Sequence, residues 1–315
     1  MRLIRLLPLA LAARLWAGAP EVSAPDGDSV VRARAGSSEI VLRTSARMAG
    51  AIDSLQWNGK EFLDAADHGR ELQSAANFDV GGLLRNEAFN PTEAGSRDDG
   101  AGPRSSSRLL YLKASGAELV TTNQMAFWLQ PGEFSGTNPA ANTTALSNHR
   151  LAKLVHIGVP GFPNAIDYTV VFFLPEGEPH VEGTFEALTG YMPAEFDTFW
   201  TFDAAAGTLA PLDAGPGEQP RPVVVSTRDG RYAMGIYSPP DPRIPDRTYG
   251  RFKFDSEKVS KWNCVFRIHN PNGIAPGAYA CRMQVIVGSL ETVRATLAGL
   301  CPQKPTRKPG NPDAN

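Results

Sequence analysis

The stretch IDYTVVFFL, residues 166–174, alternates apolar side chains with Asp167 and Thr169 and is rich in β-branched and aromatic residues. A two-residue period of this kind is typical of a strand that buries one face. A second stretch, YACRMQVIV at residues 279–287, has the same alternation. Together the two stretches predict a sheet that covers an apolar core.

Segments of similar character recur along the whole chain, bounded by Gly, Pro, Asn or Asp. Besides the two above they are residues 30–35, 39–43, 51–57, 109–114, 118–122, 125–129, 151–158, 180–188, 198–202, 222–227, 232–237, 251–254 and 261–268. Turn dipeptides such as Asn58-Gly59 and Asp229-Gly230 lie between them. The 30 Gly and 26 Pro in 315 residues also suit many short strands better than long helices.

One helix is expected, over residues 290–300, LETVRATLAGL. Its apolar residues Leu290, Val293, Leu297 and Leu300 recur at the helical period, and Ser289 can cap its start. The pattern therefore predicts an all-β fold, a large antiparallel β-sandwich with one C-terminal helix. We expect a single domain over residues 25–301, with residues 204–221 as a long loop.

The two ends of the chain differ from this pattern. Residues 1–24 begin with Arg2 and Arg5, continue with a short apolar run and end in small residues, as a signal peptide does. We therefore expect a secreted or periplasmic protein. Residues 302–315 are polar and rich in proline, which predicts a disordered tail.

Composition excludes several classes of partner. The net charge of −2 gives no basic footprint for nucleic acid, and no stretch is long and apolar enough for membrane insertion. Phosphate-binding and dinucleotide fingerprints are missing, so no cofactor is expected. The three cysteines, Cys264, Cys281 and Cys301, allow one disulfide whose pairing the spacing does not decide. They lack paired-ligand spacing, so no metal site is predicted.

The segment at residues 67–102 is unusually dense in charged and amide side chains. His68 and Arg70 flank Gly69, and Glu93 lies on a turn between Pro91 and a glycine. An imidazole, a carboxylate and a guanidinium can transfer protons and grip hydroxyl or carboxylate groups. We interpret His68 and Glu93 as catalytic and Arg70 as substrate-binding, while a plain Asp67–Arg70 pair across a tight turn is the alternative.

Two later segments carry further candidates. His149 precedes a strand, with Arg150 on the opposite face. In the strand at residues 180–188, His180, Glu182 and Glu186 share one polar face. The catalytic set is therefore His68, Glu93, His149 and Glu186. Acids that handle hydroxyls, next to aromatic rings that stack on sugars, suggest a carbohydrate groove. The expected substrate-binding residues are Arg70, Arg150, Glu182, Tyr191, Trp200 and Trp262, although Trp262 is equally compatible with the core.

The segment MAGAIDSLQWNGKEFLD, residues 48–64, resembles the opening strands of the galactose mutarotase-like β-supersandwich proteins. In that group a hairpin with a Trp-x-Gly-x-Glu turn leads into a ligand-handling loop, which here would be the segment at residues 67–102. The group includes aldose epimerases and sandwich domains of glycoside hydrolases and polysaccharide lyases. The resemblance implies a carbohydrate ligand.

We therefore expect a carbohydrate-active protein of the cell exterior that cleaves or isomerises a glycan by His/carboxylate chemistry. A glycoside hydrolase would use Glu93 and Glu186 as its two carboxylates. A polysaccharide lyase would use His68 or His149 as base, with Arg70 or Arg150 against a uronate carboxylate. The alternative is a non-catalytic carbohydrate-binding or structural β-sandwich.

Overall fold

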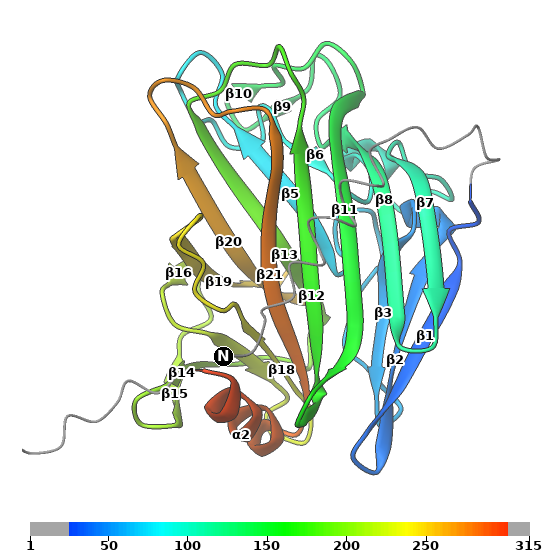
Figure 1. Ribbon diagram of the computed structural model, residues 1–315, viewed down its shortest axis with the longest axis vertical. Coiled ribbons are helices and arrows are strands. Elements are labelled where there is room, and N and C mark those ends of the chain that lie inside the picture. The colour runs from blue at the N-terminus through cyan, green and yellow to red at the C-terminus, as the bar shows by residue number, and fades with distance from the viewer. Residues whose placement is uncertain (1–24, 302–315) are drawn as a thin grey trace, which may run out of the picture.

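Long antiparallel strands make up most of the computed structural model, which describes residues 25–301 (Figure 1). The expected signal peptide, residues 1–24, and the expected tail, residues 302–315, lie outside the described residues. None of the helices in the described part is long and apolar enough to cross a membrane.

The first four strands along the described chain make a small antiparallel sheet. Its strands, in order, are β1 (Ser29–Ala35), β2 (Ser38–Ser45), β3 (Ala51–Trp57) and β4 (Lys60–Glu61). A short 3-10 turn, η1 (Ala46–Met48), joins β2 to β3. The buried face of this sheet carries Ile40, Leu42 and Leu55, which belong to the main core.

Fifteen of the remaining strands form one large sheet. In spatial order its strands are β15 (Thr208–Leu212), β14 (Thr198–Asp203), β17 (Val223–Ser226), β18 (Ala233–Tyr237), β21 (Gly277–Gly288), β12 (Phe162–Leu174), β11 (Leu146–Val159), β8 (Glu118–Phe127), β6 (Pro91–Thr92), β5 (Gln73–Phe78), β13 (Glu182–Pro193), β20 (Val259–His269), β19 (Asp246–Phe254) and β16 (Gly217–Gln219), with β7 (Arg108–Ser115) paired to β8. Strands β9 (Phe134–Ser135) and β10 (Asn138–Pro139) form a separate hairpin, and η2 (Arg97–Asp99) is a 3-10 turn.

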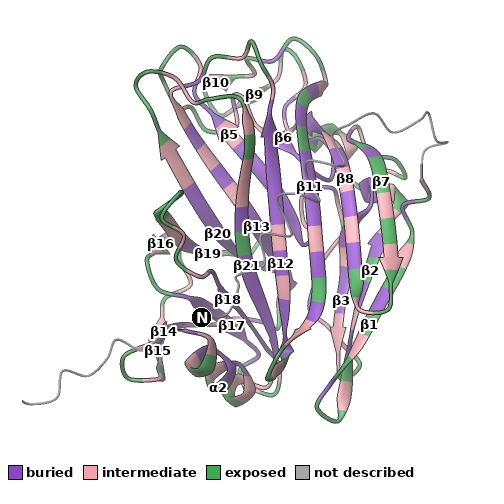
Figure 2. Ribbon diagram, in the orientation of Figure 1, coloured by how far each residue is buried: buried purple, intermediate pink, exposed green. Residues whose placement is uncertain are grey.

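This sheet folds back on itself to make the two layers of a sandwich. Strands β12 and β13 are separated in the sheet by β11, β8, β6 and β5, yet the rings of Phe172 and Phe185 lie 4.7 Å apart, centroid to centroid. Both belong to one buried cluster with Trp262 and Met283. Figure 2 shows buried and less buried residues alternating along β11, as a one-sided strand requires. The predicted all-β sandwich is confirmed.

The helix α2 (Leu290–Leu300) has the predicted bounds. The hydroxyl of Ser289 accepts a hydrogen bond from the Thr292 N–H, and Val293 and Leu297 pack on a second buried cluster with Phe202 and Val224. The helix therefore covers one end of the sheet (Figure 1).

Two expectations need correction. The segment at residues 67–102 contains β5, a strand buried along almost its whole length and paired to β13. The expected long loop at residues 204–221 contains β15 and β16, which pair with β14 and β19. The three cysteines, whose pairing the sequence left open, are buried free thiols within residues 25–301.

Candidate functional site

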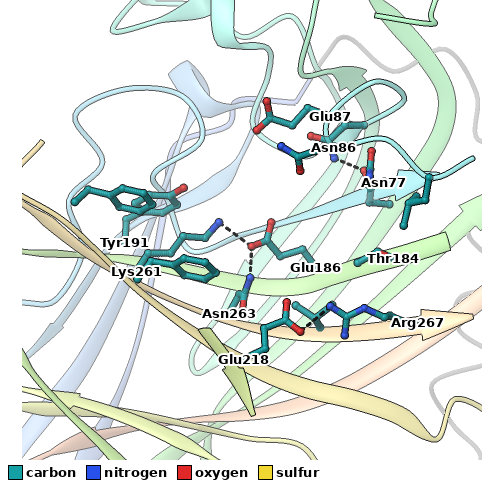
Figure 3. Close-up of a pocket in the computed structure, with 16 residues that line it drawn as sticks. Asn77, Asn86, Glu87, Thr184, Glu186, Tyr191, Glu218, Lys261, Asn263 and Arg267 are labelled. Carbon is teal, nitrogen blue, oxygen red and sulfur yellow. Dashed lines mark hydrogen bonds and ion pairs between the residues drawn. The ribbon is translucent and has the colours of Figure 1, made fainter. Parts of the chain in front are cut away.

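A polar cleft of about 620 Å³ lies on the outer face of β13, β20 and β19 (Figure 3). The loop that follows β5 closes one side and β16 borders the other. Its lining residues are Ala76, Asn77, Leu84, Asn86, Glu87, Asn90, Thr184, Glu186, Tyr191, Glu218, Phe252, Phe254, Lys261, Asn263, Val265 and Arg267.

A β-bulge in β13 decides which side chains face the cleft. The pairing register with β20 and with β5 shifts just after Glu186. A bulge adds one residue to a strand and so reverses the alternation beyond it. Thr184 and Glu186 face the cleft before the bulge, and Tyr191 faces it afterwards. Without the bulge, strict alternation from Glu186 would point the Tyr191 side chain away from the cleft.

Glu186 is the centre of the polar network. Its Oε1 lies 2.8 Å from Lys261 Nζ and accepts a hydrogen bond of 2.6 Å from Asn263 Nδ2 (Figure 3). Burial opposes ionisation, but Lys261 and the hydrogen bond from Asn263 outweigh it and lower the pKa of Glu186. The carboxylate is therefore charged near neutral pH.

Lys261 is held in its charged form by the same network. Burial disfavours the ammonium, but Glu186 and then Tyr191 raise the pKa of Lys261 above its ordinary value. Its Nζ lies 5.2 Å from the ring centroid of Tyr191 and 5.3 Å from that of Phe252, within cation–π range. Burial raises the pKa of Tyr191, so its hydroxyl stays protonated.

Aromatic rings form a row beside this network. Tyr191 and Phe254 are stacked with centroids 6.4 Å apart, and Phe254 and Phe252 are stacked at 6.2 Å. Tyr191 was predicted from the sequence as a site residue, whereas the two phenylalanines were not. The alternation in the segment RFKF, residues 251–254, was the available signal, because it puts both rings on one face.

Each charged side chain that lines the cleft has a charged or hydroxyl partner within the described part of the chain. Arg267 lies 2.6 Å from Glu218 Oε2, and Glu87 accepts a hydrogen bond of 2.6 Å from the Ser135 hydroxyl. With the Glu186–Lys261 pair, this leaves the cleft without an uncompensated cation. None of Glu87, Glu218 and Arg267 was predicted from the sequence as a site residue.

An adjoining pocket of about 360 Å³ extends the cleft and shares Tyr191 and Phe254 with it. Trp128 and Arg70 line it, and Arg70 lies 3.0 Å from both Asp67 and Glu257. The Asp67–Arg70 pair is thus formed across the turn, and Arg70 also lies at the pocket. A small hollow lined by Glu186, Trp128 and Tyr191 connects the two spaces.

Gly69 lets the turn approach Trp128. Its φ is +102°, and a Cβ there would lie 2.8 Å from the indole ring. Only glycine fits both conditions without displacement.

Two predicted catalytic residues lie in the interior. Glu93 is fully buried in an ion pair with Lys153, and its Oε2 accepts a hydrogen bond of 3.1 Å from the Ser74 N–H. His149 is also buried, with its ring stacked on Phe78 at 5.1 Å. Neither side chain lines the cleft.

The His68 side chain bridges two loops by hydrogen bonds. Its Nδ1 lies 2.7 Å from the Gly100 carbonyl oxygen and its Nε2 lies 2.8 Å from that of Arg47. The side chain borders the adjoining pocket but is only 2% exposed. Of the four predicted catalytic residues, Glu186 is the one whose side chain the structure brings into the cleft.

The predicted binding residues are dispersed. Tyr191 and Arg70 line the cleft and its adjoining pocket. Trp262 is a core residue, 1% exposed, and Trp200 donates a hydrogen bond of 3.0 Å to the Ser226 hydroxyl near α2. The remaining two, Arg150 on β11 and Glu182 at the start of β13, are not among the residues that line the cleft or the adjoining pocket.

No known family model and no curated protein matches this sequence. Among solved structures, an α-galactosidase from Lactobacillus brevis aligns over 88% of this chain with 8% identity and a TM-score of 0.41. A glycosyl hydrolase family 38 protein from Enterococcus faecalis covers 84% with 9% identity and a TM-score of 0.48. The heparan sulfate lyase HepC from Pedobacter heparinus covers 86% with 12% identity and a TM-score of 0.40.

These neighbours are carbohydrate-active enzymes with much longer chains. The chain spans 42%, 32% and 37% of their respective lengths. Membership of the galactose mutarotase-like group, which the sequence resembles, stays a prediction.

Proposed function

We propose that the protein binds a glycan in the cleft on β13, β20 and β19. The observation that carries the proposal is the row of Tyr191, Phe254 and Phe252 beside the Glu186–Lys261–Asn263 network. Sugar rings present apolar C–H faces to aromatic rings and hydroxyl groups to charged or amide side chains. The cleft offers both kinds of surface side by side.

The paired charges favour a neutral glycan over an acidic one. A uronate or sulfate group binds best to a cation that has no other partner, because displacing an existing carboxylate costs the original pair. Lys261 and Arg267 each already face a carboxylate at hydrogen-bonding distance. Paired carboxylates and cations can still exchange hydrogen bonds with uncharged hydroxyls.

The combined size of the cleft and the adjoining pocket favours a chain of sugars over a single sugar as the ligand. The cleft and the adjoining pocket meet at Tyr191 and Phe254, so one ligand can contact both. Their volumes, about 620 Å³ and 360 Å³, are in the range of sites that hold ligands larger than one sugar.

Cleavage or isomerisation of the bound glycan is the second candidate. Glu186 is ionised and can accept a proton, while Tyr191 is protonated and can donate one. Both face the same cleft, together with Lys261. This pair would replace the Glu93–Glu186 pair that the sequence suggested, because Glu93 lies in the interior.

The test is a binding screen against neutral and uronate-containing polysaccharides, followed by calorimetry on the best ligand. Tyr191→Ala should weaken binding by about 2- to 13-fold, since a stacked aromatic contributes about 0.5–1.5 kcal/mol beyond its buried area. Tyr111→Ala is the matched control, because Tyr111 is exposed on β7, outside the cleft. Binding confined to uronate polymers, or equal affinity in Tyr191→Ala and the wild type, would overturn the proposal.

The catalytic candidate is tested on the same panel. New reducing ends that disappear in Glu186→Gln, with binding retained, would support it. Absorbance of unsaturated uronates would instead indicate lyase elimination. A wild-type protein that binds a glycan without changing it is a binding module.

A further inference from the structure

Three metal-ligating side chains meet on the other side of the loop that closes the cleft. His149 comes from β11, and Glu178 and His180 come from the connection between β12 and β13. One ligand atom of each lies within 4.8 Å of the others. We call these three residues the His–Glu–His cluster.

Four buried polar atoms of this cluster have no hydrogen-bond partner among the described residues. They are both ring nitrogens of His149, Nε2 of His180 and Oε2 of Glu178. His149 Nδ1 and Glu178 Oε2 lie 3.6 Å apart, just beyond hydrogen-bonding distance. Leaving several buried polar atoms unsatisfied in one place costs free energy, which a bound ion would recover.

Neighbouring groups hold the ligands in the orientation that a metal needs. His180 Nδ1 lies 2.9 Å from the Asp79 carbonyl oxygen and donates to it, so the lone pair of Nε2 points into the cluster. Asn148 Nδ2 donates to Glu178 Oε1 at 3.1 Å, which leaves Oε2 free. Such outer contacts to histidine and carboxylate ligands are typical of metal sites.

Aromatic packing fixes the two imidazoles. Phe78 stacks on His149 at 5.1 Å and on His180 at 4.8 Å. Phe89 lies edge-on to His149 at 6.0 Å and tilted against His180 at 5.1 Å.

We propose that His149, Glu178 and His180 bind a divalent transition-metal ion of the zinc type. Two imidazoles and one carboxylate suit such an ion and not Ca²⁺ or Mg²⁺, which prefer oxygen ligands. Ligands about 2.0–2.2 Å from zinc stand about 3.4 Å apart in a tetrahedron, so small side-chain rotations close the cluster. A water supplies the fourth ligand, because both oxygens of Asp79 already accept backbone hydrogen bonds.

The ion would affect the cleft by fixing the position of one of its walls. Phe78 ends β5 and Phe89 belongs to the loop that follows it, and the same loop presents Asn86, Glu87 and Asn90 to the cleft. An ion bound to rings that pack on both phenylalanines would therefore fix this wall of the cleft. This role does not depend on which ligand the cleft takes.

The experiment uses the full chain without a polyhistidine tag, stripped with a chelator and titrated with Zn²⁺ against a chromophoric competitor. One equivalent should bind, Co²⁺ should give the visible absorption of a four-coordinate ion, and the melting temperature should rise. His149→Gln should weaken Zn²⁺ binding more than about 100-fold and Asn148→Ala about 10–100-fold. His156→Gln is the matched control, because His156 is exposed on the same strand.

The exposed position of Asn148 keeps the test valid even if His149→Gln fails to fold. Binding well below one equivalent by the wild type, or equal Zn²⁺ affinity in the wild type and in folded Asn148→Ala and Glu178→Gln, would overturn the proposal.

Discussion

The buried ion pair between Lys153 and Glu93 makes a quantitative prediction about stability. Both side chains are 0% exposed, so removing one partner leaves the other charge in the protein interior. In Lys153→Met, Glu93 would keep only the hydrogen bond from the Ser74 N–H. Burial already raises the pKa of Glu93, and without Lys153 the carboxyl must take up a proton for the chain to fold.

The cost of that protonation follows from the ordinary pKa. Protonating a carboxyl of pKa 4.5 at pH 7 costs about 3 kcal/mol, at about 1.36 kcal/mol per unit. This value agrees with the roughly 3–5 kcal/mol typical of breaking a buried pair. At pH 5 the cost falls to about 1 kcal/mol, because the unfolded state is then partly protonated as well. Lys153→Met should therefore be much less destabilised in acid than at neutral pH.

The measurement is urea unfolding at pH 5 and pH 7, followed by circular dichroism and tryptophan fluorescence. Lys253→Met is the control, since Lys253 lies in an exposed pair with Asp255 and should cost less than about 1 kcal/mol. The double variant Lys153→Met/Glu93→Gln should be less destabilised than the sum of the single variants. A loss under about 1 kcal/mol in Lys153→Met at pH 7, or a loss that does not change with pH, would refute this reasoning.

Three further predictions concern the interior. Burial raises the pKa of Glu71 to about 8, so the free energy of unfolding should fall as the pH rises from about 4.5 to 8. Glu71→Gln should therefore stabilise the protein by up to about 5 kcal/mol at pH 8 and by little at pH 5. Gly190→Ala would place a Cβ 2.6 Å from the buried Trp262 ring and should cost about 1–3 kcal/mol in urea unfolding; wild-type stability would show that the ring can move aside freely. The three cysteines should react with a thiol reagent only after denaturation, and fast labelling of the native protein would show that they are accessible.

Features that depend on local pattern could be predicted from the sequence. The strand-like composition between turn residues predicted the bounds of β3, and the helical period predicted those of α2. Strand β5, QSAANF, lacks such a signal because small and polar residues fill it, and its pairing with β13 involves a distant part of the chain. Sequence periodicity does not report such pairings.

The part of the candidate site that comes from a single strand was predictable from the sequence. Glu186 was placed in the groove because alternation sets its face, whereas Glu93 and His149 were expected there and lie inside. Their surroundings are decided by residues far along the chain, Lys153 for one and Phe78 for the other. The bulge that turns Tyr191 toward the cleft has no signature in the alternation.

The folding back of a single sheet has a consequence for the rate at which the chain acquires its structure. The Ser74 hydroxyl donates to the Ala187 carbonyl oxygen across 113 positions of sequence, where β5 pairs with β13. The entropy of closing so large a loop must be lost before the contacts across the seam can repay it. We expect the chain to refold slowly from denaturant, with the β11–β12 hairpin formed early and the seam between β5 and β13 formed late. Until that seam closes, both strand edges are open to other chains, so refolding yield should fall as protein concentration rises.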